Sequence, residues 1–185
     1  MAKIYIDQGH NPRNPNSGAE GSGYREQDLV YEIGILTANL LRSRGQEVRV
    51  SRSTPETQLG TSNATSLAAR VNDANSWGAD YFISLHANAS SVESASGSEG
   101  LVYNTQSAAV PLAESILREL NTATGLPNRG IVPRPGLYVL RRTRMPATLI
   151  ELGFITNAYD ANLMANSPIL FAEGVAEGTL KFLGL

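Results

Sequence analysis

The chain contains only two histidines, and each lies at the carboxyl end of a short apolar run. His10 follows the run that begins at Lys3, and His86 follows the run that begins at Tyr81. A third run, which begins at Ala147, leads to Glu151. In an open α/β sheet, side chains at the carboxyl ends of strands converge on one crevice even when they are distant in sequence. Two imidazoles and a carboxylate in such a crevice indicate a metal site.

A hydrolytic zinc site usually has three protein ligands and leaves the remaining position to water. His10 and His86 supply two of these ligands, and the third should be a carboxylate. Glu26 is the best placed, because it lies in the first turn of a predicted helix that follows the His10 strand. Glu20 and Asp28 remain competitors on spacing alone.

Glu151 is then not needed as a metal ligand and remains as a free carboxylate at the same edge of the sheet. At this edge it is suited to take a proton from an activated water and to pass it to a leaving amine. Burial of a carboxylate after the apolar run 147–150 is costly unless something pairs with it. Arg141, Arg142 and Arg144 have three possible roles: they pair with Glu151, lie in a solvated loop, or bind carboxylates of a substrate.

Simpler interpretations compete with the metal site. A single histidine at a strand end is more often structural than a ligand, and an acidic residue in a first turn, such as Glu26, also stabilises the helix dipole. Ser84 lies two residues before His86 on the same strand face, so a serine-type site is an alternative, although no third partner is evident. The chain has no His-Glu-x-x-His helix, no Gly-x-Ser-x-Gly elbow and no phosphate-binding Gly-Lys pair.

Composition limits the remaining possibilities. At 185 residues and 42% hydrophobic content, we predict one folded domain spanning residues 1–185. The 15 Lys+Arg and 17 Asp+Glu give a net charge of -2 without a basic stripe, which argues against a nucleic-acid partner. Because there is no cysteine, any metal must be bound by histidine and carboxylates.

Hydrophobic periodicity predicts alternating strands and helices, which is typical of a three-layer α/β sandwich with a mostly parallel sheet. The predicted helices cover residues 25–44, 66–77 and 107–124. A last helix, with Ser167 as its N-cap, begins at Pro168 and has one apolar face. We expect that face to consist of Ile169, Ala172, Ala176, Leu180 and Leu183. Besides the three runs above, strands are predicted at 46–51, 101–103 and 137–140, and loops at 54–65, 89–100 and 131–135.

We find neither a signal peptide nor a segment long enough to span a membrane, because the first apolar run is short and stops at Asp7. If the protein acts outside the cell, we expect that a leader was removed or that the protein leaves by lysis or another route.

Four ordered motifs carry a resemblance to a known family. They are Ile6–His10, Gly23–Asp28, Ser84–Ala89 and Ile150–Asn157. Together they resemble the zinc-dependent N-acetylmuramoyl-L-alanine amidases of bacterial cell walls, and the similarity spans almost the whole chain. It also includes Arg52, Arg70, Asn75, Leu137–Arg141 and Pro146.

The resemblance implies a mixed sheet of about six strands flanked by helices, with Zn²⁺ bound by His10, Glu26 and His86, and with Glu151 as catalytic acid and base. It thereby favours Glu26 over Glu20. The implied reaction is hydrolysis of the amide that joins the lactyl group of N-acetylmuramic acid to L-alanine of the peptidoglycan stem peptide.

The resemblance also has implications for substrate binding, partners and cellular location. Asn88, Arg141 and Arg142 are candidate substrate residues. Some family members carry an inserted helix between the regions of Asn88 and Gly100; here that stretch is short, so we expect an open groove. Peptidoglycan is the expected partner, with an activator protein as a further candidate, and we expect a monomer located at the cell wall, outside the cell, or released on lysis.

Two other classes of function remain as alternatives. A zinc metallopeptidase that cuts another stem-peptide bond would share the chemistry, but it would need a pocket for a terminal carboxylate, which Arg141 or Arg142 could provide. A non-catalytic wall-binding module would lack a ligand or the base, whereas all four positions are filled here.

Overall fold

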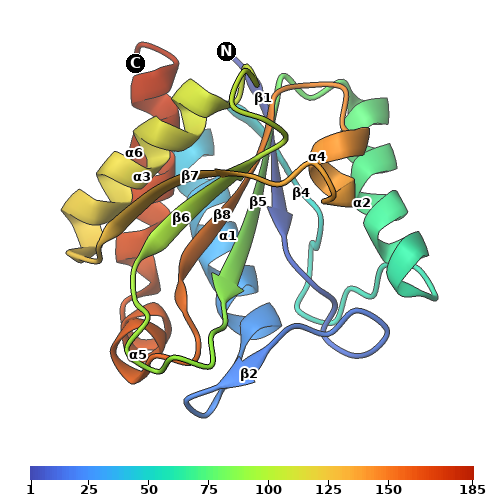
Figure 1. Cartoon of the computed structure of the whole chain (residues 1–185). Coiled ribbons are helices and arrows are strands. Elements are labelled where there is room, and N and C mark those ends of the chain that lie inside the picture. The colour runs from blue at the N-terminus through green and yellow to red at the C-terminus, as the bar shows by residue number, and fades with distance from the viewer.

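The computed structural model describes all 185 residues and is built around a six-stranded sheet with the order β4-β1-β5-β8-β6-β7 (Figure 1). Every neighbouring pair is parallel except β6 and β8, which are antiparallel. The predicted mixed, mostly parallel sheet is therefore confirmed. The strands span β1 Lys3–Gln8, β4 Glu47–Val50, β5 Tyr81–Asn88, β6 Ser98–Val102, β7 Asn128–Pro133 and β8 Ala147–Phe154. A separate short hairpin pairs β2 Glu20–Gly21 with β3 Tyr24–Arg25.

Helices form a layer on each face of the sheet (Figure 1). The helices α1, α3 and α6 cover one face, α2 and α4 cover the other, and α5 lies beside the lower end of the sheet. The bounds are α1 Glu26–Ser43, α2 Asn63–Trp77, α3 Val110–Thr124, α4 Tyr138–Arg142, α5 Ala158–Asn166 and α6 Pro168–Phe182. This arrangement is the three-layer α/β sandwich that the sequence predicts.

The two faces of the sheet have separate hydrophobic cores. In β5, Ile83 and Leu85 belong to the larger core beneath α1, α3 and α6, whereas Phe82 belongs to the smaller core beneath α2 and α4. Side chains alternate along a strand, so Ser84 and His86 project from the same face as Phe82. His86, the candidate functional residue of this strand, therefore lies on the face that α2 and α4 cover only in part (Figure 1).

The helix signals in the sequence are mostly correct. The helix α1 buries Leu29, Ile33 and Leu41 at three- and four-residue spacing, and it carries Glu26 and Asp28 in its first turn. The helix α2 begins three residues earlier than predicted, because Ser62 and Thr65 form a capping box. The predicted apolar face of α6 is wrong at its first residue, since Ile169 is 41% exposed while Ala172, Ala176 and Leu180 are buried.

Several predicted segments differ from the structure. The run 137–140, predicted as a strand, lies in the short helix α4, and the segment 131–135, predicted as a loop, lies largely in β7. The predicted loop 89–100 ends sooner, because β6 begins at Ser98. The helix α5 and the β2–β3 hairpin were not predicted. Apolar runs of four or five residues do not distinguish a strand from one turn of helix, and two-residue strands leave no periodic signal.

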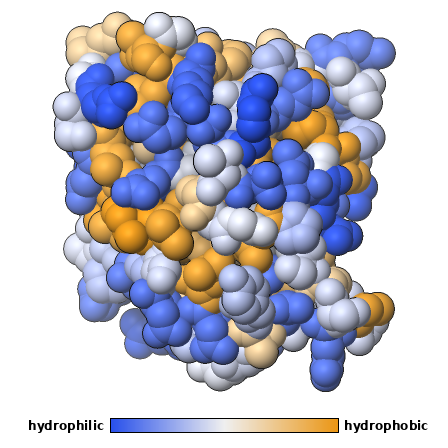
Figure 2. Space-filling model, turned by 90° about the vertical axis from the view of Figure 1, so that its left-hand side faces the viewer, coloured by the Kyte–Doolittle hydropathy of each residue, from blue (hydrophilic) through white to orange (hydrophobic).

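None of the helices combines the length and the apolar character that crossing a membrane requires. On the side where α3 and α6 lie, polar side chains surround several separate apolar groups (Figure 2).

Candidate active site

His10, Glu26 and His86 come together at the carboxyl ends of β1 and β5. The distance from Glu26 Oε1 to His10 Nε2 is 3.1 Å, and that to His86 Nδ1 is 2.9 Å. The two imidazole rings lie 4.8 Å apart, with an angle of 75° between their planes. One ligand atom from each residue lies within 4.8 Å of the others. The structure thus assembles the three side chains that the sequence singled out.

The backbone turn after β1 determines how closely His10 and His86 can approach each other. His10 follows β1 by two residues and has a left-handed φ of 66°. A Cβ at Gly9 would lie 2.5 Å from His86 Cε1, so only glycine leaves room for the second imidazole there. The turn after β1 therefore carries one imidazole and makes space for the other.

Two backbone N–H groups, one from the preceding loop and one from β5, hold Glu26 in place at the start of α1. Ala19 N–H donates to Glu26 Oε2 at 2.9 Å, and Ala87 N–H donates to Glu26 Oε1 at 3.0 Å. The two competing carboxylates point elsewhere: Glu20 is exposed, and Asp28 pairs with Arg25 at 2.7 Å. Of the three carboxylates, Glu26 is the one that reaches the histidines.

The electrostatics of this cluster favour a cation. Burial alone would raise the pKa of Glu26, but its hydrogen bonds with His10 and His86 hold the pKa well below the usual range. Burial alone would lower the pKa of His86, but the hydrogen bond with Glu26 and its charge raise it. Two imidazole nitrogens and one ionised carboxylate oxygen form a donor set that suits a divalent ion such as zinc and leaves further positions open. The residues present therefore fit a metal.

Glu151 lies beside this cluster without joining it. It is the direct partner of His86 in the β5–β8 pairing and of Glu99 in the β6–β8 pairing. Glu151 Oε2 is buried and has no hydrogen-bond partner. Burial, reinforced by the charges of Glu26 and Glu99, raises the pKa of Glu151 to about 7, although the nearby His86 lowers it. A carboxyl group with this pKa can exchange a proton near neutral pH.

The arginines expected near Glu151 do not pair with it. Arg141 and Arg142 lie in the last turn of α4 with exposed side chains, and Arg144 is exposed just beyond the helix. The ion-pair interpretation of these arginines is therefore wrong. Asn88 ends β5, and its Oδ1 accepts a hydrogen bond from Ala89 N–H at 2.9 Å. No hydrogen bond or ion pair joins Asn88, Arg141 or Arg142 to the His–Glu–His cluster.

A serine nucleophile is excluded by the surroundings of Ser84. Its side chain is fully buried, and its hydroxyl donates to Asp7 Oδ2 at 2.7 Å. Asp7 in turn pairs with the buried Arg70 at 2.6 Å. Sequence reasoning did not assign a role to Asp7, Arg70 or Glu99. The available signals were that Asp7 lies within the Ile6–His10 motif and that the family resemblance includes Arg70.

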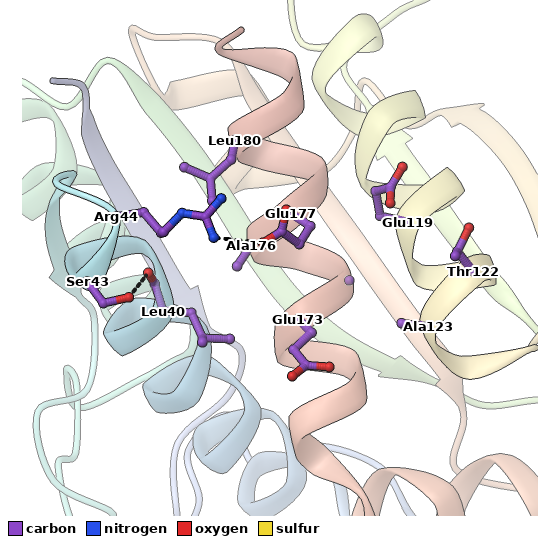
Figure 3. Close-up of a pocket in the computed structure, with 11 residues that line it drawn as sticks. Leu40, Ser43, Arg44, Glu119, Thr122, Ala123, Glu173, Ala176, Glu177 and Leu180 are labelled. Atoms are coloured by element: carbon purple, nitrogen blue, oxygen red, sulfur yellow. Dashed lines mark hydrogen bonds and ion pairs between the residues drawn. The ribbon is translucent and has the colours of Figure 1, made fainter. Parts of the chain in front are cut away.

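Two cavities clarify which surface carries the chemistry. A cavity of about 110 Å³ adjoins His10 and His86, and Leu137 and Tyr138 form part of its wall. A larger cavity of about 420 Å³ lies between α1, α3 and α6, where side chains such as Arg44 and Glu173 line it (Figure 3). None of the candidate residues lines this larger cavity, so its size does not mark the active site.

A mixed α/β sheet with a His–Glu–His cluster at one edge and a separate carboxyl group on the neighbouring strand is the arrangement of a metal-dependent hydrolase. The family model described as N-acetylmuramoyl-L-alanine amidase matches residues 4–181, and the chain belongs to this family.

Curated and solved relatives agree with this assignment. The chain is 34% identical to N-acetylmuramoyl-L-alanine amidase CwlM of Bacillus licheniformis over 188 residues, which cover 100% of this chain and 70% of the relative. The catalytic domain of the amidase CwlV from Bacillus (Paenibacillus) polymyxa var. colistinus superposes with a TM-score of 0.85 at 30% identity, covering 100% and 99% of the two chains. An N-acetylmuramoyl-L-alanine amidase from Clostridium difficile 630 gives a TM-score of 0.89 at 30% identity, covering 100% and 97%.

Proposed function

We propose that this chain hydrolyses the amide between the lactyl group of N-acetylmuramic acid and L-alanine in peptidoglycan, with zinc as its metal and residues 1–185 as a single catalytic domain. The observation that carries the proposal is the convergence of His10, Glu26 and His86 beside Glu151, in a chain of the amidase family. It follows that the protein acts at the bacterial cell wall.

His10, Glu26 and His86 would hold the ion through Nε2, a carboxylate oxygen and Nδ1. When bound, the ion supplies a Lewis acid that polarises the amide carbonyl and lowers the pKa of water. The two backbone N–H groups on Glu26 keep its carboxylate directed at the imidazoles. The burial of Glu26 limits competition from solvent for that carboxylate.

Glu151 would act as the proton carrier. As a carboxylate it takes a proton from the attacking water, and as the acid it returns that proton to the departing amine of L-alanine. Both steps need a group that exchanges a proton near neutral pH, and in the metal-free chain burial raises the pKa of Glu151 to about 7. Its position next to His86, one strand away, keeps this proton transfer beside the metal site.

Asn88, Arg141 and Arg142 are proposed as substrate residues. The two arginines are exposed on α4, which covers part of the same face of the sheet, and they could meet the carboxylates of a stem peptide. Alanine substitution at these positions should raise KM more than it lowers kcat, because they lie apart from the cluster that carries the reaction. The segment between β5 and β6 contains no helix, so nothing in this stretch forms a helical plug.

The direct test is digestion of purified peptidoglycan, with and without a chelator, followed by mass spectrometry. Free stem peptides with new L-alanine amino termini, lost on chelation and restored by zinc, are the expected result. Cleavage at another bond of the stem peptide would instead identify a metallopeptidase. Absence of cleavage with zinc present would refute activity of the isolated chain and favour a binding module or an activator-dependent enzyme.

A further inference from the structure

A buried ion pair lies behind the two histidines. Arg70 Nη1 is 2.6 Å from Asp7 Oδ1, and the side chains of both residues are 1% exposed. Asp7 belongs to β1 and Arg70 to α2, so the pair joins the sheet to the helical layer on the side of the active site. Burial alone would raise the pKa of Asp7, but the charge of Arg70 and the hydrogen bonds from Ser84 and Arg70 lower it, so the Asp7 carboxyl group is ionised.

The guanidinium group of Arg70 also holds the turn that carries His10. Its Nη1 donates to the carbonyl oxygen of Gln8 at 2.6 Å, and its Nη2 donates to the carbonyl oxygen of His10. These carbonyl groups flank Gly9, and His10 has a left-handed φ of 66° that most residues avoid. A single planar group therefore fixes a disfavoured backbone conformation on which the direction of the His10 imidazole depends.

The other member of the pair holds the strand that carries His86. Asp7 Oδ2 accepts a hydrogen bond from Ser84 Oγ at 2.7 Å. Ser84 lies two residues before His86, and both side chains project from the same face of β5. Asp7 and Arg70 thus make polar contacts with both segments that present an imidazole.

We propose that the Asp7–Arg70 pair is a positioning device that sets the separation and direction of the His10 and His86 imidazoles for metal binding. The inference rests on the proposed metal site. Buried ion pairs add little net stability compared with apolar residues of similar volume, so stability alone does not account for placing one here. A fork of donors that reaches two carbonyl oxygens and a carboxylate is a property of arginine that lysine does not share.

The test separates positioning from folding. The double variant Asp7→Leu/Arg70→Met replaces the pair with apolar side chains, which often leaves stability unchanged. Zinc affinity is measured by competition with a chromophoric chelator, and the ligand geometry is followed through the visible absorption of the cobalt-substituted protein. We expect zinc to bind 10- to 100-fold more weakly and the cobalt spectrum to change, with the thermal midpoint of the metal-free protein near that of the wild type.

Arg70→Lys provides a milder version that keeps the positive charge. It should weaken zinc binding and alter the cobalt spectrum, because an ammonium group cannot reach both carbonyl oxygens and Asp7 together. This variant decides the question if the double variant does not fold. Wild-type zinc affinity and an unchanged cobalt spectrum in Arg70→Lys would overturn the proposal.

Phe171→Leu is the matched control. Phe171 is fully buried in α6, within the core on the other face of the sheet. Its truncation should lower stability while leaving zinc affinity and the cobalt spectrum unchanged. If wild-type protein fails to bind zinc at all, the proposed metal site fails; if the wild type binds but the Arg70 variants bind equally well, only the positioning role fails.

Discussion

Glu151 and His86 are direct partners across the parallel β5–β8 pairing, so their side chains project from the same face of the sheet on neighbouring strands. One of them is a candidate metal ligand, whereas the other has a buried carboxylate oxygen without a partner. This separation of roles between neighbouring strands allows ligand binding and proton transfer to be tested independently.

Glu151→Gln should abolish turnover while leaving metal bound. The amide keeps the shape of the side chain but cannot carry the proton, and general acid–base groups typically contribute about 10²- to 10⁴-fold in rate. Release of stem peptides gives the rate, and elemental analysis of the purified protein gives the metal content. Glu93→Gln, at an exposed glutamate between β5 and β6, is the control and should retain activity. Full activity of Glu151→Gln would remove Glu151 from the reaction.

The same variant should change how stability depends on pH in the metal-free protein. The pKa of Glu151 is about 7 in the folded chain, against about 4.3 for an unfolded glutamate. Because the folded state binds this proton more tightly, the stabilisation is fully present below pH about 4.3 and is lost as pH rises through about 7. Above pH 7, Glu151→Gln should therefore be more stable than the wild type, by on the order of 3 to 4 kcal/mol. Denaturant unfolding across this pH range measures the difference, and a difference independent of pH would contradict the raised pKa.

Glu99→Gln should move this pH dependence toward lower pH. Glu99 is the direct partner of Glu151 in the antiparallel β6–β8 pairing, and its negative charge is one cause of the raised pKa of Glu151. Removing that charge makes ionisation of Glu151 easier. Carbon-13 NMR of the Glu151 carboxyl group in metal-free protein would follow the titration. An unchanged or higher pKa in Glu99→Gln would show that the two carboxyl groups do not interact.

Gly178→Ala should destabilise the fold without affecting the site. A Cβ at Gly178 in α6 would lie 2.4 Å from the Cα of Ile116 in α3, a backbone atom that cannot move without displacing its helix. Overpacking of this kind costs about 1 to 3 kcal/mol, more than alanine gains in helix propensity. Thermal unfolding measures the effect, and Glu173→Ala, at an exposed position of the same helix, is the control. An equal midpoint in both variants would mean that α3 and α6 are less closely packed than described.

The sequence predicted those parts of the site that depend on strand ends. His10, His86 and Glu151 each follow or end an apolar run, and parallel strands bring such positions to one edge. The candidate carboxylate ligand was harder to identify from the sequence, because Glu26 reaches the cluster with the help of backbone contacts with Ala19, in a loop next to the unpredicted β2–β3 hairpin.

Features that depend on long-range pairing had no local signal. Arg70 and Asp7 are separated by 63 positions, and nothing near Arg70 in the sequence identifies its partner. Similarly, the antiparallel placement of β6 next to β8, which puts Glu99 opposite Glu151, follows from the topology rather than from any local pattern. The sheet and its main helices were predictable from periodicity, whereas the short elements were not.

Zinc should stabilise the folded chain, and Glu26→Gln should remove most of that effect. A ligand that binds only the folded state raises stability by mass action, by about 2.7 kcal/mol at a concentration 100 times its Kd. Glu26→Gln keeps the size of the side chain but removes the negative charge that lies 2.9 Å from His86 and 3.1 Å from His10. Thermal midpoints with zinc and with a chelator, together with the metal content of the purified proteins, give the comparison. Glu20→Gln, at an exposed carboxylate six positions earlier, should respond to zinc like the wild type. If Glu26→Gln retains its full metal content and its zinc-dependent midpoint, the acidic residue at the start of α1 serves the helix dipole rather than the metal.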